Sequence, residues 1–218
     1  EGSPAFYRKA EGKSYFEFDL KETPVPSSEY NIIAVGDPQP RSKDHFNEFA
    51  GVPLDDIRQC VSGLKTPTVA IVVGDITHDK YYLMKDWKET MKSEPIPFYP
   101  VIGNHDHNRK FNDDDLASGL YNEAFGPADY AFFMGKDVVI VLDNIIYHSR
   151  SGYELGYTDS LIDWVRGLMK YVPADADIYV AQHSSLNGRH YAGMITNHDA
   201  LLEILRGHEV AFISGHNH

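Results

Sequence analysis

Near-continuous apolar runs, rich in β-branched residues, recur along the chain from residue 31 onward. They are NIIAVGD (31–37), TVAIVVGD (68–75), FYPVIGNHD (98–106), IYVAQHS (178–184) and EVAFISGHNH (209–218). Runs of this kind are typical of strands that are buried on both faces of a sheet. A further stretch, YAFFMGKDVVIVLDN (130–144), predicts a β-hairpin that turns at residues 134–136.

Segments with one apolar and one charged face separate these runs and predict helices. Within 158–172 the apolar positions follow helical spacing, and Gly207 is typical of the residue after a helix end. Strand–helix alternation with an added hairpin predicts an α/β fold in which helices cover a sheet system. The predicted helical segments are 43–63, 79–92, 158–172 and 197–207.

Residues 1–28 differ from the rest of the chain. The stretch YFEFDL predicts one short strand, and Pro24, Pro26, Ser27 and Ser28 follow it as a linker. We therefore interpret 1–28 as a strand and linker, the tail of a preceding module, and 29–218 as one domain. With 42% hydrophobic residues, the 218-residue chain has enough apolar side chains for a full core.

Composition narrows the classes of function. A net charge of −12 argues against a broad basic surface for nucleic acid, although bound divalent cations would still permit anionic substrates. No apolar stretch approaches the length of a transmembrane helix, and no signal peptide opens the sequence. The one cysteine, Cys60, excludes an internal disulfide, and its apolar neighbours predict a buried thiol.

Each apolar run ends in polar residues that bind metals or phosphate. In α/β folds the functional site lies where strands end at their carboxyl side, so we expect these side chains to meet. Without a thiolate, the set has too many donors for one four-coordinate zinc and suits two adjacent ions. The candidate ligands are Asp37, Asp75, Asn104, His183, His216 and His218.

Taken one at a time, the motifs are also compatible with ordinary structural roles. Asp37 precedes a proline and suits a turn, Asp75 suits a helix N-cap, and we assign His78 and Asp79 to the start of the next helix. The stretch NHDH (104–107) is more specific. An H-x-H zinc pair of the metallo-β-lactamase type would continue with Asp and His where Arg109 and Lys110 stand, so we reject that reading.

The ordered motifs resemble those of the calcineurin-like metallophosphoesterase superfamily. They read Asp37-Pro38-Gln39, Gly74-Asp75, Gly103-Asn104-His105-Asp106, His183 and Gly215-His216-Asn217-His218, and they span residues 31–218. The resemblance implies a four-layer α/β/β/α sandwich of two mixed sheets flanked by helices. It also implies that 29–218 is the catalytic domain. Further strands normally follow the last motif in this family, so we expect the domain to be truncated here and the full-length chain to continue past His218.

The resemblance also implies a role for each site residue. Asp37 and His218 would hold the first divalent ion, Asp75 would bridge both ions, and Asn104, His183 and His216 would hold the second. His105 would be the general acid, oriented by Asp106. The expected ions are Mn, Fe or Zn, with Mg an option at the first site.

The chain departs from the family pattern at Gln39, where a histidine normally stands. A glutamine carbonyl is a weaker ligand than imidazole, so Gln39 either binds the first metal or hydrogen-bonds a water on it. The main hypothesis is a dinuclear phosphomonoesterase or phosphodiesterase in which a metal-bridging hydroxide attacks phosphorus and His105 protonates the leaving group. The alternative is a catalytically weak or degenerate phosphoester-binding protein that retains one metal.

Substrate choice is assigned to loops around 39–50, 107–128 and 144–157, where Arg109 is a candidate for phosphate binding together with Asn104. The expected partner is a small phosphorylated substrate, with no nucleic acid. A nuclease lacks support because no basic, aromatic-rich segment is present, and a serine hydrolase lacks its G-x-S-x-G motif. The linker and single cysteine suit an exported or periplasmic bacterial enzyme, and a cytosolic one would show the same features.

Overall fold

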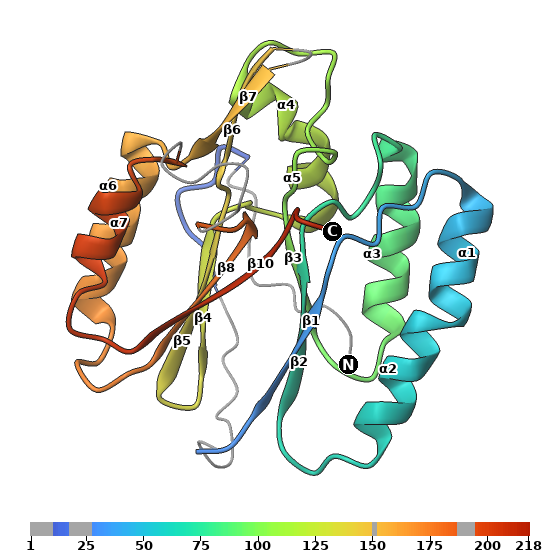
Figure 1. The fold of residues 1–218 in the computed structure, drawn as a ribbon, viewed down its shortest axis with the longest axis horizontal. Helices are drawn as coiled ribbons and strands as arrows, with labels where there is room; N and C mark the ends of the chain where they lie inside the picture. Colours follow the sequence, from blue (N-terminus) through green and yellow to red (C-terminus); the bar gives the residue numbers. More distant parts are fainter. Residues whose placement is uncertain (1–10, 18–27, 150–151, 187–194) are drawn as a thin grey trace.

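Two β-sheets packed face to face form the centre of the molecule, and a layer of helices covers each outer side (Figure 1). The computed structural model describes residues 11–17, 28–149, 152–186 and 195–218. Helices α1, α2 and α3 lie on one outer side, and α6 and α7 lie on the other. This arrangement confirms the predicted α/β/β/α sandwich.

The first sheet has the order β1-β2-β3, and all three strands are parallel. The strands are β1 (Asn31–Val35), β2 (Thr68–Val73) and β3 (Phe98–Val101). The register pairs Val35 with Val72 and Val73 with Val101. The polar residues that follow the three strands therefore leave the sheet at the same edge.

The second sheet has the order β10-β8-β5-β4 and is mixed. Its strands are β4 (Tyr130–Met134), β5 (Asp137–Leu142), β8 (Ile178–Ser184) and β10 (Val210–Gly215). Strands β4 and β5 form the predicted antiparallel hairpin, and β5, β8 and β10 run parallel. The carboxyl ends of β8 and β10 are thus neighbours.

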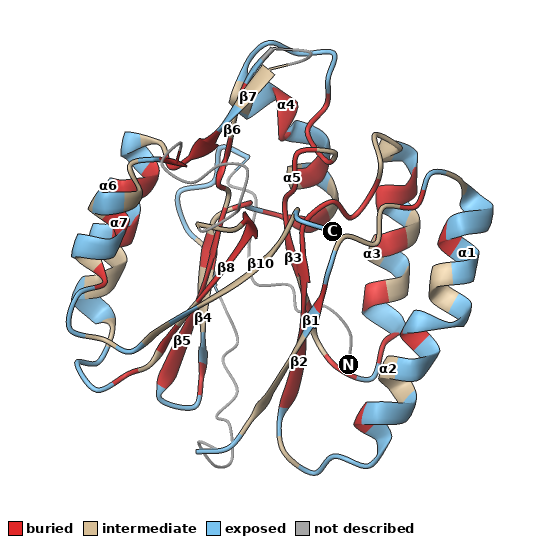
Figure 2. Ribbon diagram, in the orientation of Figure 1, coloured by how far each residue is buried: buried red, intermediate tan, exposed pale blue. Residues whose placement is uncertain are grey.

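Alternating side chains of the central strands form separate cores. In β2, Ile71 and Val73 join Val139 and Val141 of β5 in the core between the two sheets. The next residue along β2, Val72, faces the opposite way and packs with Trp87 under the first helical layer. Successive strand residues point to opposite faces, so continuous apolar strands serve two cores at once. Figure 2 accordingly shows β2 and β5 in the colour of buried residues.

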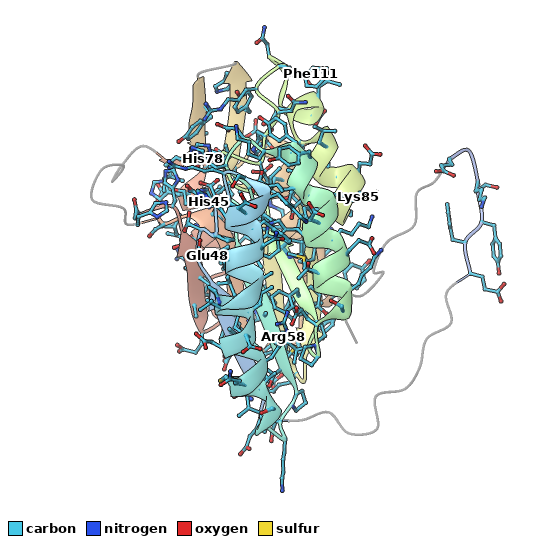
Figure 3. The ribbon with its side chains drawn as sticks, turned by 90° about the vertical axis from the view of Figure 1, so that its right-hand side faces the viewer. His45, Glu48, Arg58, His78, Lys85 and Phe111 are labelled. Atoms are coloured by element: carbon cyan, nitrogen blue, oxygen red, sulfur yellow. The ribbon has the colours of Figure 1, made fainter. Side chains whose placement is uncertain are left out.

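The first helical layer consists of α1 (Lys43–Gly51), α2 (Pro53–Ser62), η1 (Tyr81–Leu83) and α3 (Met84–Ser93). The predicted segment 43–63 is therefore two helices, and Pro53 occupies the first turn of the second one. Arg58, labelled in Figure 3, joins α2 to the loop after α3 by donating to Glu94 Oε1 at 2.6 Å. Cys60 of α2 is exposed, so the prediction of a buried thiol was wrong.

The second helical layer contains α6 (Asp159–Leu168), η2 (Met169–Tyr171) and α7 (His198–Ile204). Thr158 caps α6 by accepting a hydrogen bond from the Leu161 amide. Leu161, Ile162 and Val165 are buried against the second sheet, as the helical spacing predicts. Gly207 has a positive φ of 99° but stands beyond the last turn of α7.

Two regions expected to be loops contain regular structure. Residues 107–128 include α4 (Asp114–Ala117) and α5 (Gly119–Phe125). Residues 144–157 include β6 (Ile145–Ser149) and β7 (Gly152–Gly156), which form a small sheet with β9 (Ile195–Thr196). These additions stand above the carboxyl ends of the main strands in Figure 1.

The strand predicted at YFEFDL has no counterpart among residues 15–17, and its remainder lies outside the described residues. None of the helices formed by the described residues has the length and apolarity needed to cross a bilayer.

Candidate metal and phosphoester site

The carboxyl ends of five strands deliver polar side chains to one place. Asp37 follows β1, Asp75 follows β2 and Asn104 follows β3, while His183 lies near the end of β8 and His216 follows β10. One oxygen or nitrogen from each of Asp37, Asp75 and His183 lies within 4.8 Å of the other two. The structure therefore brings together the residues that the strand ends predict.

Glycines let these strand ends approach closely. A Cβ on Gly74 would overlap the His183 ring, and one on Gly215 would overlap the Asp37 carboxylate. A Cβ on Gly103 would overlap the backbone nitrogen of Asp75. The three glycines remove side-chain bulk at the points where neighbouring strand ends carry their functional groups.

Several site residues also adopt left-handed backbone conformations, which non-glycine residues rarely do. The φ values are 40° at Asp37, 40° at Gln39, 49° at Asp75, 56° at Asp79 and 69° at His216. Conformations of this kind cost free energy and persist where the surrounding structure imposes them, often at functional sites. The turns after the strands thus direct their side chains inward at the expense of local backbone strain.

His183 is at the centre of the most buried donor group. Its Nδ1 lies 2.8 Å from the Val73 carbonyl oxygen, which can only accept, so Nδ1 carries a proton. In the neutral ring, Nε2 then has a lone pair. That lone pair faces Asn104 Oδ1 at 3.0 Å, Asp75 Oδ1 at 3.3 Å and His216 Nδ1 at 3.1 Å. A proton on Nε2 or a cation among these atoms would satisfy them, so the donor set fits a divalent metal.

Electrostatic effects in this group follow from burial and proximity. Burial favours the neutral acid at Asp75, but the hydrogen bond and charge of His183 outweigh it and hold the pKa of Asp75 below its usual value. Burial and the charge of His183 lower the pKa of His216 to about 4. His216 is therefore neutral near pH 7, which is the form of imidazole that binds metals.

The second donor group contains Asp37, Gln39 and His218. His218 Nε2 lies 4.0 Å from Asp37 Oδ1, and the backbone amide of His216 donates to both Asp37 oxygens at 3.1 and 3.0 Å. Burial raises the pKa of Asp37. Asp75 lies between the two groups, because its Oδ1 faces His183 and its Oδ2 accepts a 2.6 Å hydrogen bond from Gln39 Nε2.

Both polar atoms of the Gln39 side-chain amide lie close to other side chains of the site. Its Nε2 lies 3.2 Å from His218 Nε2 in addition to the Asp75 contact, while its Oε1 lies 3.2 Å from His78 Nδ1. The amide thus presents its nitrogen, which cannot bind a metal, toward the candidate first-metal residues. In this orientation Gln39 is a hydrogen-bond donor to the group.

His105 is oriented by a different carboxylate from the predicted one. Its Nδ1 lies 3.0 Å from Asp79 Oδ1, and Arg109 Nε lies 3.1 Å from the same oxygen. Asp79 belongs to the turn before η1 and was assigned to the start of a helix. The sequence signal for its role is its position four residues after Asp75, on the same strand-end turn.

Asp106 has a structural role in this arrangement, and the predicted contact with the His105 ring is not made. Its fully buried carboxylate accepts hydrogen bonds from the backbone amides of Ile76, Thr77 and Gly103 at 2.9 to 3.0 Å. Burial and the charge of Asp75 raise the pKa of Asp106 to about 7. Asp106 therefore joins the turn after β2 to the turn after β3.

His78 is a second residue that the sequence analysis placed elsewhere. Its ring lies against the His105 ring, with centroids 4.1 Å apart, and its Nδ1 faces Gln39. In Figure 3 the His78 label lies at the upper end of the first helical layer, above His45 of α1. His78 thereby connects Gln39 with His105.

Together, the sandwich of sheets and the oxygen and imidazole donors at the strand ends define an α/β protein of the phosphoesterase type with candidate metal ligands. Comparison with known proteins agrees. The model of the calcineurin-like phosphoesterase family matches residues 30–218, and the chain belongs to that family. Its members are hydrolases that act on phosphoesters and usually bind divalent metals.

Solved structures include similar folds. The phosphopantetheinyl hydrolase from Mycobacterium tuberculosis has a TM-score of 0.55 and 11% sequence identity, over 88% of this chain and 84% of that one. At this level of identity the likeness concerns the fold. A comparison with curated proteins found no match.

Proposed function

We propose that this protein is a dinuclear divalent-metal hydrolase of phosphomonoesters or phosphodiesters. The observation that carries the proposal is the convergence of Asn104 Oδ1, Asp75 Oδ1 and His216 Nδ1 on Nε2 of His183, all within 3.3 Å. Asp75 would bridge the two ions, since its two oxygens face the two donor groups. Asp37 and His218 would hold the first ion, and Asn104, His183 and His216 the second.

Divalent ions held there would supply positive charge opposite the phosphate oxygens and a water of lowered pKa. Mn, Fe and Zn suit the mixed imidazole and carboxylate donors, and Mg is an option at the first position, where harder donors prevail. Binding of ions would also require the Gln39 amide to give up its hydrogen bond to Asp75 or to turn its oxygen inward.

The protein side chains would position and protonate the substrate. His105 would donate a proton to the leaving oxygen, with Asp79 holding the ring through Nδ1. Arg109 lies beside that pair, with Nη2 at 3.3 Å from His105 Nδ1, and its exposed guanidinium is placed to meet a phosphate. Asn104 would add a neutral donor for the same phosphate.

The substrate we propose is small and phosphorylated. A net charge of −12 disfavours a nucleic-acid backbone, whereas a small anion needs only a local positive centre. The name of the similar structure, a phosphopantetheinyl hydrolase, makes a phosphopantetheinyl compound one of the substrates to test beside simple monoesters, diesters and pyrophosphate.

The general-acid role is tested by varying the leaving group. Removal of His105 should slow phenyl phosphate hydrolysis by about 10²–10⁴-fold, because phenolate leaves poorly without a proton. The loss should be much smaller for p-nitrophenyl phosphate, whose leaving group needs no proton. Equal losses of kcat for both esters in His105→Ala with Mn²⁺ would rule out this role.

A second candidate, a protein that binds phosphoesters with a single metal and hydrolyses them weakly, has one observation in its favour. Gln39 occupies the motif position at which the sequence resemblance leads us to expect a histidine, and its amide nitrogen donates to Asp75 at 2.6 Å. Titration of metal-free protein with Mn²⁺ separates the candidates. Two equivalents bound support the dinuclear enzyme, and one equivalent with negligible turnover supports the alternative.

A further inference from the structure

The hydroxyl of Tyr81 contacts the main chain of the turn that carries Arg109. It donates to the His107 carbonyl oxygen at 2.8 Å and accepts a hydrogen bond from the Arg109 amide nitrogen at 3.1 Å. Within the described part of the chain, no other group makes a hydrogen bond to either of these backbone atoms. One hydroxyl therefore supplies both the donor and the acceptor that this turn needs.

The surroundings of Tyr81 make it a firm support for that turn. Tyr81 is the first residue of η1, and its ring packs against the core under the first helical layer. Burial raises the pKa of Tyr81, so the hydroxyl keeps the proton that it donates to His107. A tyrosine with a packed ring and a hydrogen-bonded hydroxyl has little freedom to move.

Asp79, two residues before Tyr81, holds the other end of the same arginine. Its Oδ1 lies 3.1 Å from Arg109 Nε and 3.0 Å from His105 Nδ1. The segment 79–81 thus fixes Arg109 both at its backbone and at its guanidinium. A long side chain that is 47% exposed would otherwise lose rotamer freedom on binding a ligand, which costs free energy. Support at both ends removes part of that cost in advance.

The rest of the turn is tied to other parts of the fold. Asn108 N donates to the Ala117 carbonyl oxygen at 2.7 Å, and His107 Nδ1 lies 3.0 Å from the Gly103 carbonyl oxygen. Neither contact involves Tyr81. Loss of the Tyr81 hydroxyl should therefore leave the turn folded and release only the backbone beside the arginine.

We infer that Tyr81 is a positioning residue for phosphate binding. Its hydroxyl fixes the backbone of Arg109, so that the guanidinium, oriented by Asp79, is placed in advance to meet a phosphate oxygen. Tyr81 acts through Arg109 and does not itself touch the substrate. This inference rests on the proposed function, in which Arg109 meets the phosphate, and adds the residue that holds it there.

Tyr81→Phe keeps the ring and removes only the hydroxyl. Calorimetric titration of the whole Mn²⁺-loaded chain with orthophosphate should give a Kd about three- to tenfold weaker than that of the wild type, as for the loss of about one hydrogen bond. KM for p-nitrophenyl phosphate should rise by a similar factor, while kcat changes by about twofold or less. Tyr82→Phe, at the neighbouring tyrosine with 63% of its surface exposed, is the matched control and should bind phosphate as the wild type does.

A double variant separates positioning from a purely structural effect. If Tyr81 acts through Arg109, then Tyr81→Phe should weaken the phosphate Kd in the wild type but not in Arg109→Gln. Equal weakening in both backgrounds would overturn the inference, because the hydroxyl would then act without the arginine. An unchanged Kd in Tyr81→Phe, or no binding of orthophosphate to the wild type at millimolar concentration, would overturn it as well.

The binding measurement needs no turnover, so it tests Tyr81 independently of hydrolysis. A wild type that binds phosphate through Arg109 and Tyr81 but hydrolyses no ester would refute the proposed function alone. A wild type that hydrolyses esters while Tyr81→Phe binds phosphate equally well would refute the role of Tyr81 alone. Tm values without ligand show that each variant is folded.

Discussion

His105 Nδ1 lies 3.0 Å from Asp79 Oδ1, and the two residues come from turns after adjacent strands of one sheet. A carboxylate at one ring nitrogen fixes the orientation of the imidazole and leaves the other nitrogen for the substrate. The contact with Asp79 therefore supports a proton-donor role for His105, which the sequence analysis had expected Asp106 to support.

Asp79→Asn should lower kcat for phenyl phosphate by about ten- to a hundredfold, because the imidazole loses the charge that orients it. Asparagine tolerates the φ of 56° at this position, so folding should be preserved. The measurement is steady-state kinetics with Mn²⁺ for wild type and variant. Asp163→Asn, at an exposed carboxylate paired with Arg166, is the control. An Asp79→Asn rate equal to that of the wild type would exclude the positioning role.

Gln39→His should tighten binding of a second divalent ion by about tenfold or more, since imidazole is a better ligand than an amide for Zn²⁺ and Mn²⁺. Histidine is among the residues that tolerate the positive φ of 40° found here. Isothermal titration of metal-free protein with Mn²⁺ gives both Kd values. If the weaker Kd did not change, residue 39 would not belong to the first metal position.

Gly103→Ala should destabilise the fold by about 1–3 kcal/mol, because its Cβ would overlap the backbone of Asp75, which cannot move as a side chain can. Gly167→Ala is the matched control in α6. Its Cβ would meet nothing within 4 Å, and alanine favours a helix by about 0.5–1 kcal/mol. Urea unfolding measures both changes in the free energy of unfolding. If Gly103→Ala left the free energy of unfolding unchanged, the turns at residues 75 and 103 would not be closely packed.

The pH dependence of stability should reveal Asp129. Its pKa is raised to about 7 in the folded protein by burial and by Asp143, so the folded state holds a proton that the unfolded chain releases near pH 4. The free energy of unfolding should therefore fall as the pH rises from about 4 to 7. The free energy of unfolding of the wild type, relative to that of Asp129→Asn, should therefore decrease across that pH range. A difference independent of pH would contradict the raised pKa.

The sequence predicts the layers and most of the site because both depend on local patterns. Buried parallel strands read as continuous apolar runs, and the residues after β1, β2, β3, β8 and β10 must then share one edge of the sheets. The match of the family model and the order of the layers confirm the predicted family and fold.

Contacts between turns are harder to predict. The sequence places Asp106 beside His105, but the chain direction turns Asp106 into the protein interior, where three amides bind it. Asp79 is distant in sequence and reaches His105 only through the folded turn. Short elements such as β6 and α4 lack the long periodic patterns that identify the main strands and helices.

The most direct test of the proposed activity is to measure hydrolysis of p-nitrophenyl phosphate, a monoester, and bis(p-nitrophenyl) phosphate, a diester, before and after metal removal. Wild-type protein treated with a chelator should lose activity and regain it with Mn²⁺. Asp75→Asn, which removes the charge between the two donor groups, should stay inactive at every Mn²⁺ concentration. Hydrolysis that persists without metal, or full Mn²⁺-dependent activity in Asp75→Asn, would contradict the account.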